Sequence, residues 1–105
     1  MNKQVASLTR EIRSKIKKGK KIAFISGNFN VVHPGHVRLL NFASECADYL
    51  VVGVNPDGSP DAFVPQELRL EGIKAIGLVN FALILTMPML EFVASLKPEI
   101  VVKGK

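Results

Sequence analysis

Two histidines stand three residues apart in the segment His33-Pro34-Gly35-His36, and the sequence contains no other histidine. An imidazole can donate a hydrogen bond to a phosphate oxygen as charge develops in a transition state. Gly35 lets the main chain approach a ligand closely. The segment also precedes a helical pattern, and the N–H groups and dipole at a helix start favour an anion. His33 and His36 therefore predict a phosphate-binding loop.

Two other interpretations of the histidine pair involve no phosphate. The histidines could be ordinary loop residues that make only local hydrogen bonds, and this alternative stays open. A metal site would need further ligands, but no cysteine, aspartate or glutamate stands near the pair at ligand spacing. We therefore expect no metal site made by the protein.

The elements around this loop follow from the pattern of apolar residues. Lys21–Ser26 is a short apolar run typical of a buried strand, and the helical pattern resumes from Gly35 to Ala47. The loop 27–34 joins the two elements, and we expect Gly27 to permit the turn out of the strand. The histidines would thus lie between the end of a strand and the start of a helix.

The rest of the chain repeats this alternation. The further elements we expect are a helix over 4–18 ended by Gly19, a strand Tyr49–Val54, a helix Gln66–Ile76, a strand Phe81–Leu85, a helix capped by Thr86 and running to Leu96, and a strand Ile100–Lys103. Strands that alternate with helices predict a parallel sheet of four or more strands in a three-layer α/β/α, Rossmann-like fold. Ligands of such sheets bind beyond the carboxyl ends of the strands, where the loop with the histidines begins.

Basic residues are concentrated at the start of the chain. The 105 residues carry a net charge of +5, and residues 1–21 contain eight basic side chains against one acidic. We therefore divide the chain into a basic amphipathic helix, residues 1–20, and one α/β domain, residues 21–105. A basic segment can bind nucleic acid, but no aromatic residue interleaves with this one, so a solvated helix is the better interpretation.

The single cysteine and the apolar segments indicate the environment of the protein. Cys46 has no disulfide partner and falls in a helical pattern, so we expect a small buried side chain in a reducing cytoplasm. The first residues lack the apolar core of a signal peptide. Residues 75–96 are apolar, but Asn80, Thr86, Pro88 and Glu91 interrupt them, which predicts a buried strand and helix and no membrane span.

A known family shares these features. The run Ile25–Gly58, the helix that carries Arg69 and the ending KPEIVVKGK resemble the cytidylyltransferase-like nucleotidyltransferases over residues 21–105. The sequence is most similar to the sugar-phosphate branch: the adenylyltransferase domain of bacterial ADP-heptose synthases and the glycerol-3-phosphate cytidylyltransferases. Histidine-any-glycine-histidine after a lead-in such as Gly27-Asn28-Phe29-Asn30 is specific to this superfamily.

The resemblance implies transfer of a nucleotidyl group from ATP or CTP, usually with Mg²⁺, to a phosphorylated sugar or alcohol, with release of pyrophosphate. Such enzymes supply precursors of lipopolysaccharide and the cell envelope. It makes His33 and His36 the catalytic residues. It implies that further positions bind the nucleotide: Gly27, Asn28, Phe29, Asn30, Gly35, Asn55, Asp57, Arg69, Lys103 and Gly104. Of these, Arg69 would help to hold phosphates, and Lys103 and Gly104 would lie near the base.

Three departures from the family pattern bear on activity. Asn30 replaces the usual aspartate, the loop between Asp57 and Leu68 lacks the usual cation, and the chain stops before the family's Ser/Thr-rich last segment. We therefore expect little activity from this chain alone. A homodimer, or a place in a longer protein, would follow from an open sheet edge or from the apolar face of the helix over 4–18. The alternative function is a non-catalytic nucleotide-binding or scaffolding domain.

Overall fold

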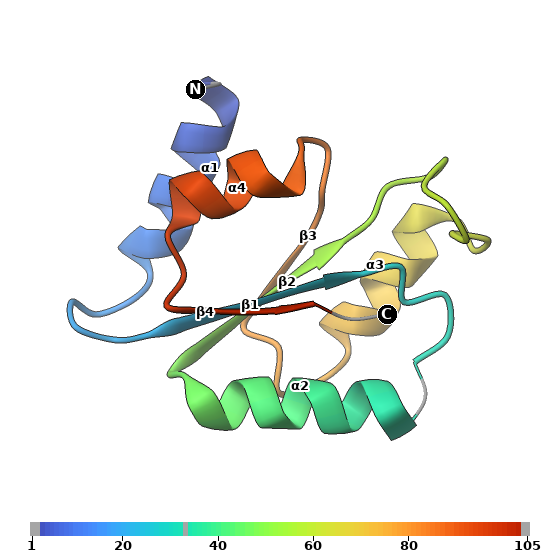
Figure 1. Ribbon diagram of the computed structural model, residues 1–105, viewed down its shortest axis with the longest axis horizontal. Coiled ribbons are helices and arrows are strands. Elements are labelled where there is room, and N and C mark those ends of the chain that lie inside the picture. Colours follow the sequence, from blue (N-terminus) through green and yellow to red (C-terminus); the bar gives the residue numbers. More distant parts are fainter. Residues whose placement is uncertain (1–2, 33, 104–105) are drawn as a thin grey trace.

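A computed structural model describes residues 3–32 and 34–103 and shows a four-stranded parallel sheet between two pairs of helices (Figure 1). The strands are β1 (Ile22–Gly27), β2 (Tyr49–Val54), β3 (Phe81–Ile84) and β4 (Ile100–Lys103). The helices are α1 (Lys3–Ser14), α2 (Pro34–Cys46), α3 (Gln66–Lys74) and α4 (Met89–Leu96). The order β3-β2-β1-β4 places β1 at the centre, and each neighbouring pair is parallel. The predicted Rossmann-like fold is confirmed.

Alternation along the strands divides the core in two. In β1, Ala23 and Ile25 pack on the side of α2 and α3, whereas Ile22 and Phe24 pack on the side of α1 and α4. All six residues of β1 are buried. Successive side chains of a strand point to opposite faces, so a strand covered on both sides is a continuous apolar run. Figure 1 shows the two helix pairs on opposite faces of the sheet.

Three expectations about local structure were wrong. Helix α1 ends at Ser14, because Lys15 and Ile16 donate to carbonyls three residues earlier and turn the chain toward β1; Gly19, with a φ of 90°, lies beyond this turn. Thr86 does not cap α4, which starts at Met89 after Pro88 with no side-chain cap. Cys46 is half-buried, because it lies in the last turn of α2.

Helix α1 packs on α4 and closes one face of the sheet. Its Val5 and Ile12 are 1% and 0% exposed, so this apolar face is already covered within the chain and is not available for association. The hydroxyls of Thr9 and Ser95 lie 2.6 Å apart across the helix pair. Arg13 donates to the carbonyls of Leu96 and Lys97 and so ties α1 to the end of α4. Among the described helices, none is both long and apolar enough to cross a membrane.

Glu99 joins the amino-terminal ends of the neighbouring strands β1 and β4. Its Oε1 accepts the N–H of Ile22 at 2.7 Å, and its Oε2 lies 3.8 Å from Nη2 of Arg13. The hydrogen bond from Ile22 holds the pKa of Glu99 below its ordinary value, with smaller contributions from the charges of Arg13 and Lys21. Because the folded-state pKa is lowered, Glu99 stabilises the fold above the ordinary glutamate pKa, and the contribution is lost as pH falls through the folded-state value.

We expect Glu99→Gln to destabilise the fold at neutral pH by less than about 1 kcal/mol, since the carboxylate is partly solvated. The difference from wild type should shrink as the pH falls from the ordinary glutamate pKa through the lowered pKa of folded Glu99, below which both proteins carry a neutral side chain. Urea unfolding over a pH series measures this difference. Glu45→Gln, at an exposed position of α2, is the matched control and should show no such trend. A constant difference between Glu99→Gln and wild type at all pH values would contradict the assignment.

Candidate functional site

The candidate site lies at the carboxyl end of β1. The loop that follows β1 leads into α2, and His36 lies in the first turn of that helix, as the sequence predicted. A pocket of about 390 Å³ opens beside it; its lining is Asn28, Phe29, Asn30, Val31, His36, Asp61 and Phe63. His33 lies outside the described residues, so the described part of the motif is Pro34, Gly35 and His36.

Phe29 positions His36, and its ring explains why residue 27 is a glycine. The Phe29 ring is 5% exposed and meets the His36 imidazole edge-on, with ring centroids 5.4 Å apart. A Cβ on Gly27 would lie 3.1 Å from this ring, so Gly27 leaves room for it. We expected Gly27 to permit the turn out of the strand. The residue of this turn that has a left-handed backbone is instead Phe29, with a φ of 52°. Gly27 therefore acts through packing and Phe29 supplies the turn.

An amide pair joins the ends of the two central strands. Nδ2 of Asn55, directly after β2, donates to Oδ1 of Asn28 at 2.8 Å, and Nδ2 of Asn28 donates to the carbonyl of Pro60. Asn28 lines the pocket of His36, whereas Asn55 lines a second pocket of about 580 Å³ with residues 56 and 85–89. The amide pair thus joins the linings of two pockets at the carboxyl end of the sheet. This arrangement can hold two substrates near each other.

Asn30 binds the loop after β2 through both ends of its carboxamide. Its Nδ2 donates to the carbonyl of Asp61 at 2.7 Å, and its Oδ1 accepts the N–H groups of Phe63 and Val64 at 2.7 and 3.1 Å. An aspartate could accept from these N–H groups but could not donate to the carbonyl of Asp61. Asn30, where the resemblance implies an aspartate, therefore supplies a donor that this loop conformation uses.

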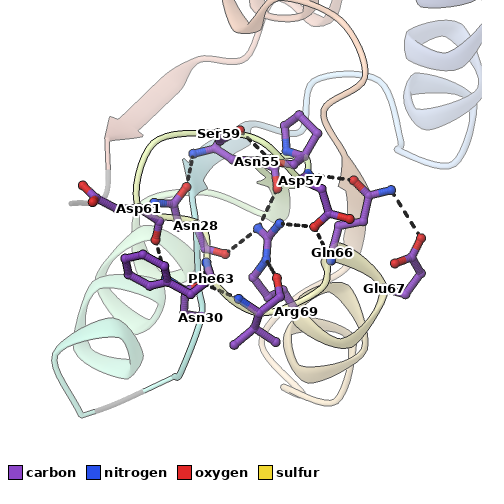
Figure 2. Close-up of polar contacts among 12 residues, drawn as sticks. Asn28, Asn30, Asn55, Asp57, Ser59, Asp61, Phe63, Gln66, Glu67 and Arg69 are labelled. Atoms are coloured by element: carbon purple, nitrogen blue, oxygen red, sulfur yellow. Dashed lines mark hydrogen bonds and ion pairs between the residues drawn. The ribbon is translucent and has the colours of Figure 1, made fainter.

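Arg69 is buried and joins the loop after β1 to the loop after β2. Figure 2 shows its guanidinium at the centre of the polar network. Its Nε donates to the carbonyl of Val64 at 2.6 Å, and its Nη1 donates to the carbonyls of Asn28 and Asn55 at 2.9 and 2.6 Å. Its Nη2 lies 3.3 Å from Oδ1 of Asp57, and the Arg69 side chain is 0% exposed. A guanidinium turned inward in this way holds the loops that frame the site.

Asp57 has a part in starting helix α3. Its Oδ1 accepts the N–H of Gln66, the first residue of α3, at 2.8 Å, and its own N–H donates to Oε1 of Gln66 at 2.9 Å. This exchange has the form of a capping box made between residues nine apart in sequence. Asp57 therefore satisfies one N–H of the helix start while it faces the Arg69 guanidinium.

The remaining predicted nucleotide contacts lie at the end of β4 and the start of α2. The backbone of Lys103 pairs with Ser26, so it reaches the carboxyl edge beside β1, on the side away from β2. Gly104 lies outside the described residues. Gly35 is exposed in the first turn of α2, next to His36. A base contact of residue 103 would thus lie across β1 from the loop that carries Asp57.

The charges of the described site are few. No lysine or arginine lines the pocket of His36. No group of three or more histidine, cysteine, aspartate or glutamate side chains that could hold a metal occurs in 3–32 and 34–103. An anion at this pocket would be bound chiefly by imidazole and by the N–H groups at the start of α2, since the amides of Asn28 and Asn30 donate to the carbonyls of Pro60 and Asp61.

Comparison with known proteins decides the family. The model of the family described as cytidylyltransferase-like matches residues 24–105. The chain belongs to the cytidylyltransferase-like family. This confirms the resemblance inferred from the HPGH segment, and it places the loop after β1 and the start of α2 within the matched region.

Relatives of this cytidylyltransferase-like chain include longer bacterial proteins. It is 36% identical over 96 residues to the bifunctional protein HldE of Paramagnetospirillum magneticum, covering 84% of this chain and 20% of that protein. It is 35% identical over 108 residues to HldE of Gluconobacter oxydans, covering 95% of this chain and 22% of that protein. The chain thus spans about a fifth of the length of these relatives.

A solved structure shares the fold. The crystal structure of the lipopolysaccharide core biosynthesis protein from Thermoplasma volcanium GSS1 matches with a TM-score of 0.72 and 26% sequence identity. The match covers 79% of this chain and 73% of that protein. The arrangement of the cytidylyltransferase-like sheet and helices is therefore one that a protein of similar length already displays.

Proposed function

We propose that this chain is the nucleotide-binding domain of a nucleotidyltransferase. It would bind ATP or CTP and transfer the nucleoside monophosphate to a phosphorylated sugar or alcohol, in the synthesis of lipopolysaccharide or another cell-envelope precursor. The observation that carries the proposal is the position of His36, in the first turn of α2 at the carboxyl end of the central strand. Family membership and similarity to HldE support it.

The proposed reaction is an in-line displacement. An oxygen of the acceptor phosphate attacks the α-phosphorus of the nucleotide, the bond to the bridging oxygen breaks, and pyrophosphate leaves with that oxygen. The protein contributes position and charge stabilisation more than covalent chemistry. His36 and the N–H groups at the start of α2 would donate to the phosphate oxygens as their charge rises. His33 is proposed as the second donor by its place in the motif.

Mg²⁺ enters this proposal as the companion of the triphosphate. The described residues do not form a cage for the ion, and Mg²⁺ in such enzymes commonly rests on nucleotide phosphates with few protein ligands. Bound there, it would offset phosphate charge.

The free thiol of Cys46 and the need for nucleoside triphosphates support a reducing cytoplasm as the location.

The open edge of the sheet supports association. Among the described strands, β4 pairs only with β1, and Val101 on it is 47% exposed. An unpaired strand edge is a template for another chain or for further residues of a longer protein. We propose that this edge pairs with a second copy in a homodimer or with further residues of a longer chain. Light scattering on the 105-residue protein tests the homodimer.

An assay of pyrophosphate release tests the proposed function. The protein is incubated with ATP or CTP, Mg²⁺, and a panel of sugar phosphates and glycerol-3-phosphate. We expect release that depends on one nucleotide and one class of acceptor, at a low rate. Loss of one preorganised donor commonly costs about 10²–10³ in rate, and the loop 57–68 lacks a cation.

The lack of cations in the pocket lining favours the second candidate, a non-catalytic nucleotide-binding domain. Nucleotide binding by calorimetry, with no release for any acceptor, would support that candidate and contradict the transferase. No binding of either nucleotide would contradict both functions.

A further inference from the structure

Two large apolar side chains stand exposed at the pocket that contains His36. Val31 is 70% exposed and Phe63 is 80% exposed, and both line this pocket. Single exposed apolar residues are ordinary on protein surfaces. Here the two come from loops far apart in sequence and border the same pocket as the candidate catalytic histidine. The outer part of the pocket therefore presents two apolar side chains, beside the exposed Asp61 of the same lining.

The main chain of Phe63 is held in place by Asn30. The Asn30 carboxamide accepts the Phe63 N–H at 2.7 Å and donates to the carbonyl of Asp61 at 2.7 Å, across 33 and 31 residues. Figure 2 shows Asp61, Phe63 and Asn30 together beside Asn28. An exposed ring whose backbone is fixed by a distant side chain is preorganised for contact with a ligand, because little order is lost on binding.

The chemistry of the lining distinguishes the inner end of the pocket from its rim. His36 and the start of α2 suit a phosphate at the inner end. Val31 and Phe63 at the rim carry no charge and cannot bind a second phosphate. The same lining contains the polar side chains of Asn28, Asn30 and Asp61. This sequence of groups fits a phosphate attached to an uncharged ring that bears hydroxyl groups.

The base position that the resemblance implies for Lys103, together with the strand order, indicates which substrate presents that ring. Phe63 belongs to the loop that follows β2, whereas Lys103 ends β4 on the other side of β1. A nucleotide whose base lies toward β4 leaves the side of β2 for the acceptor. We propose that Phe63 is a specificity residue that packs against the sugar ring of a cyclic sugar phosphate acceptor. This inference rests on the proposed nucleotidyltransferase function.

Binding measurements on single variants test the role of Phe63. The protein is first saturated with the ATP or CTP analogue whose α,β-bridging oxygen is a methylene group, so that no transfer occurs. Glucose-1-phosphate, mannose-1-phosphate, galactose-1-phosphate and glycerol-3-phosphate are then titrated by calorimetry. The variants are Phe63→Ala, Phe63→Leu and Phe63→Tyr. Leu68→Ala is the matched control, since Leu68 is a 57% exposed apolar residue outside the pocket lining.

We expect at least one cyclic sugar phosphate to bind more tightly than glycerol-3-phosphate. Phe63→Ala and Phe63→Leu should weaken its binding by about tenfold, whereas Phe63→Tyr and Leu68→Ala should retain wild-type affinity. Affinity for glycerol-3-phosphate and for the nucleotide analogue should not change.

Three results would overturn the assignment of Phe63. They are wild-type binding that shows no preference for cyclic sugar phosphates, unchanged sugar affinity in Phe63→Ala, and a loss of nucleotide affinity in Phe63→Ala, which would place the base on this ring. Failure of the proposed function gives a different result: the wild-type protein would release no pyrophosphate with any acceptor, or would not bind the nucleotide analogue, whatever residue stands at position 63.

Discussion

Replacing Arg69 by alanine is expected to lower the free energy of unfolding by about 3–5 kcal/mol. The guanidinium is the donor to the carbonyls of Val64, Asn28 and Asn55, and its side chain is 0% exposed. Alanine would leave these acceptors at a void that water fills only in part. The loops after β1 and β2 would lose the group that joins them. Urea unfolding at neutral pH measures the loss.

A lysine at this position is expected to recover less than half of the lost stability. Its ammonium is a single point of charge and cannot reproduce the planar arrangement of donors that meets Val64 on one side and Asn28 and Asn55 on the other. Arg10→Ala is the control, because Arg10 is exposed on α1. An Arg69→Ala protein within about 0.5 kcal/mol of wild type would show that the loops do not depend on this network.

Replacing His36 by alanine is expected to weaken nucleotide binding by about 1–3 kcal/mol, which is roughly 5- to 150-fold in the dissociation constant. The imidazole is oriented by its edge-on contact with Phe29 at 5.4 Å and lies in the first turn of α2. Its removal takes away a donor to phosphate but leaves the N–H groups of the helix start. Binding should therefore weaken without disappearing.

Calorimetry with ATP and CTP measures this effect. Val37→Ala is the matched control, because Val37 is the next residue of α2 and is 43% exposed. It should bind nucleotide as wild type does. Equal affinity in His36→Ala and wild type would place the nucleotide elsewhere, and the other pocket, lined by Asn55 and residues 85–89, would become the site to test.

The fold could be predicted from the sequence because its strands are buried on both faces. The strand at Tyr49–Val54 was predicted with its observed bounds, since a covered parallel strand is a continuous apolar run. The position of His36 at a helix start followed from the same pattern. The end of α1 did not, because hydrogen bonds of Lys15 and Ile16 turn the chain before Gly19.

The inner construction of the site could not be predicted. The sequence suggested that Arg69 helps to hold phosphates, whereas its side chain is buried and donates to the main-chain carbonyls of Asn28, Asn55 and Val64. Carbonyls have no signature in a sequence, so nothing marks these partners before the loops are folded. From the sequence, Asn30 showed only that a negative charge is missing. Its role as a donor follows from the hydrogen bond to the carbonyl of Asp61, which exists only in the folded loops.

The pairing of β1 with β4 also constrains the order in which the protein can form. Ala23 lies opposite Ile100 in the register, so the central strand finds its second neighbour only near the end of the described chain. Such long-range pairing slows folding, since a large loop must close before the contact is made. During synthesis on the ribosome, β1, β2 and β3 can assemble first while one side of β1 remains unpaired. The nascent protein therefore exposes a hydrogen-bonding edge at its centre until β4 emerges and occupies it.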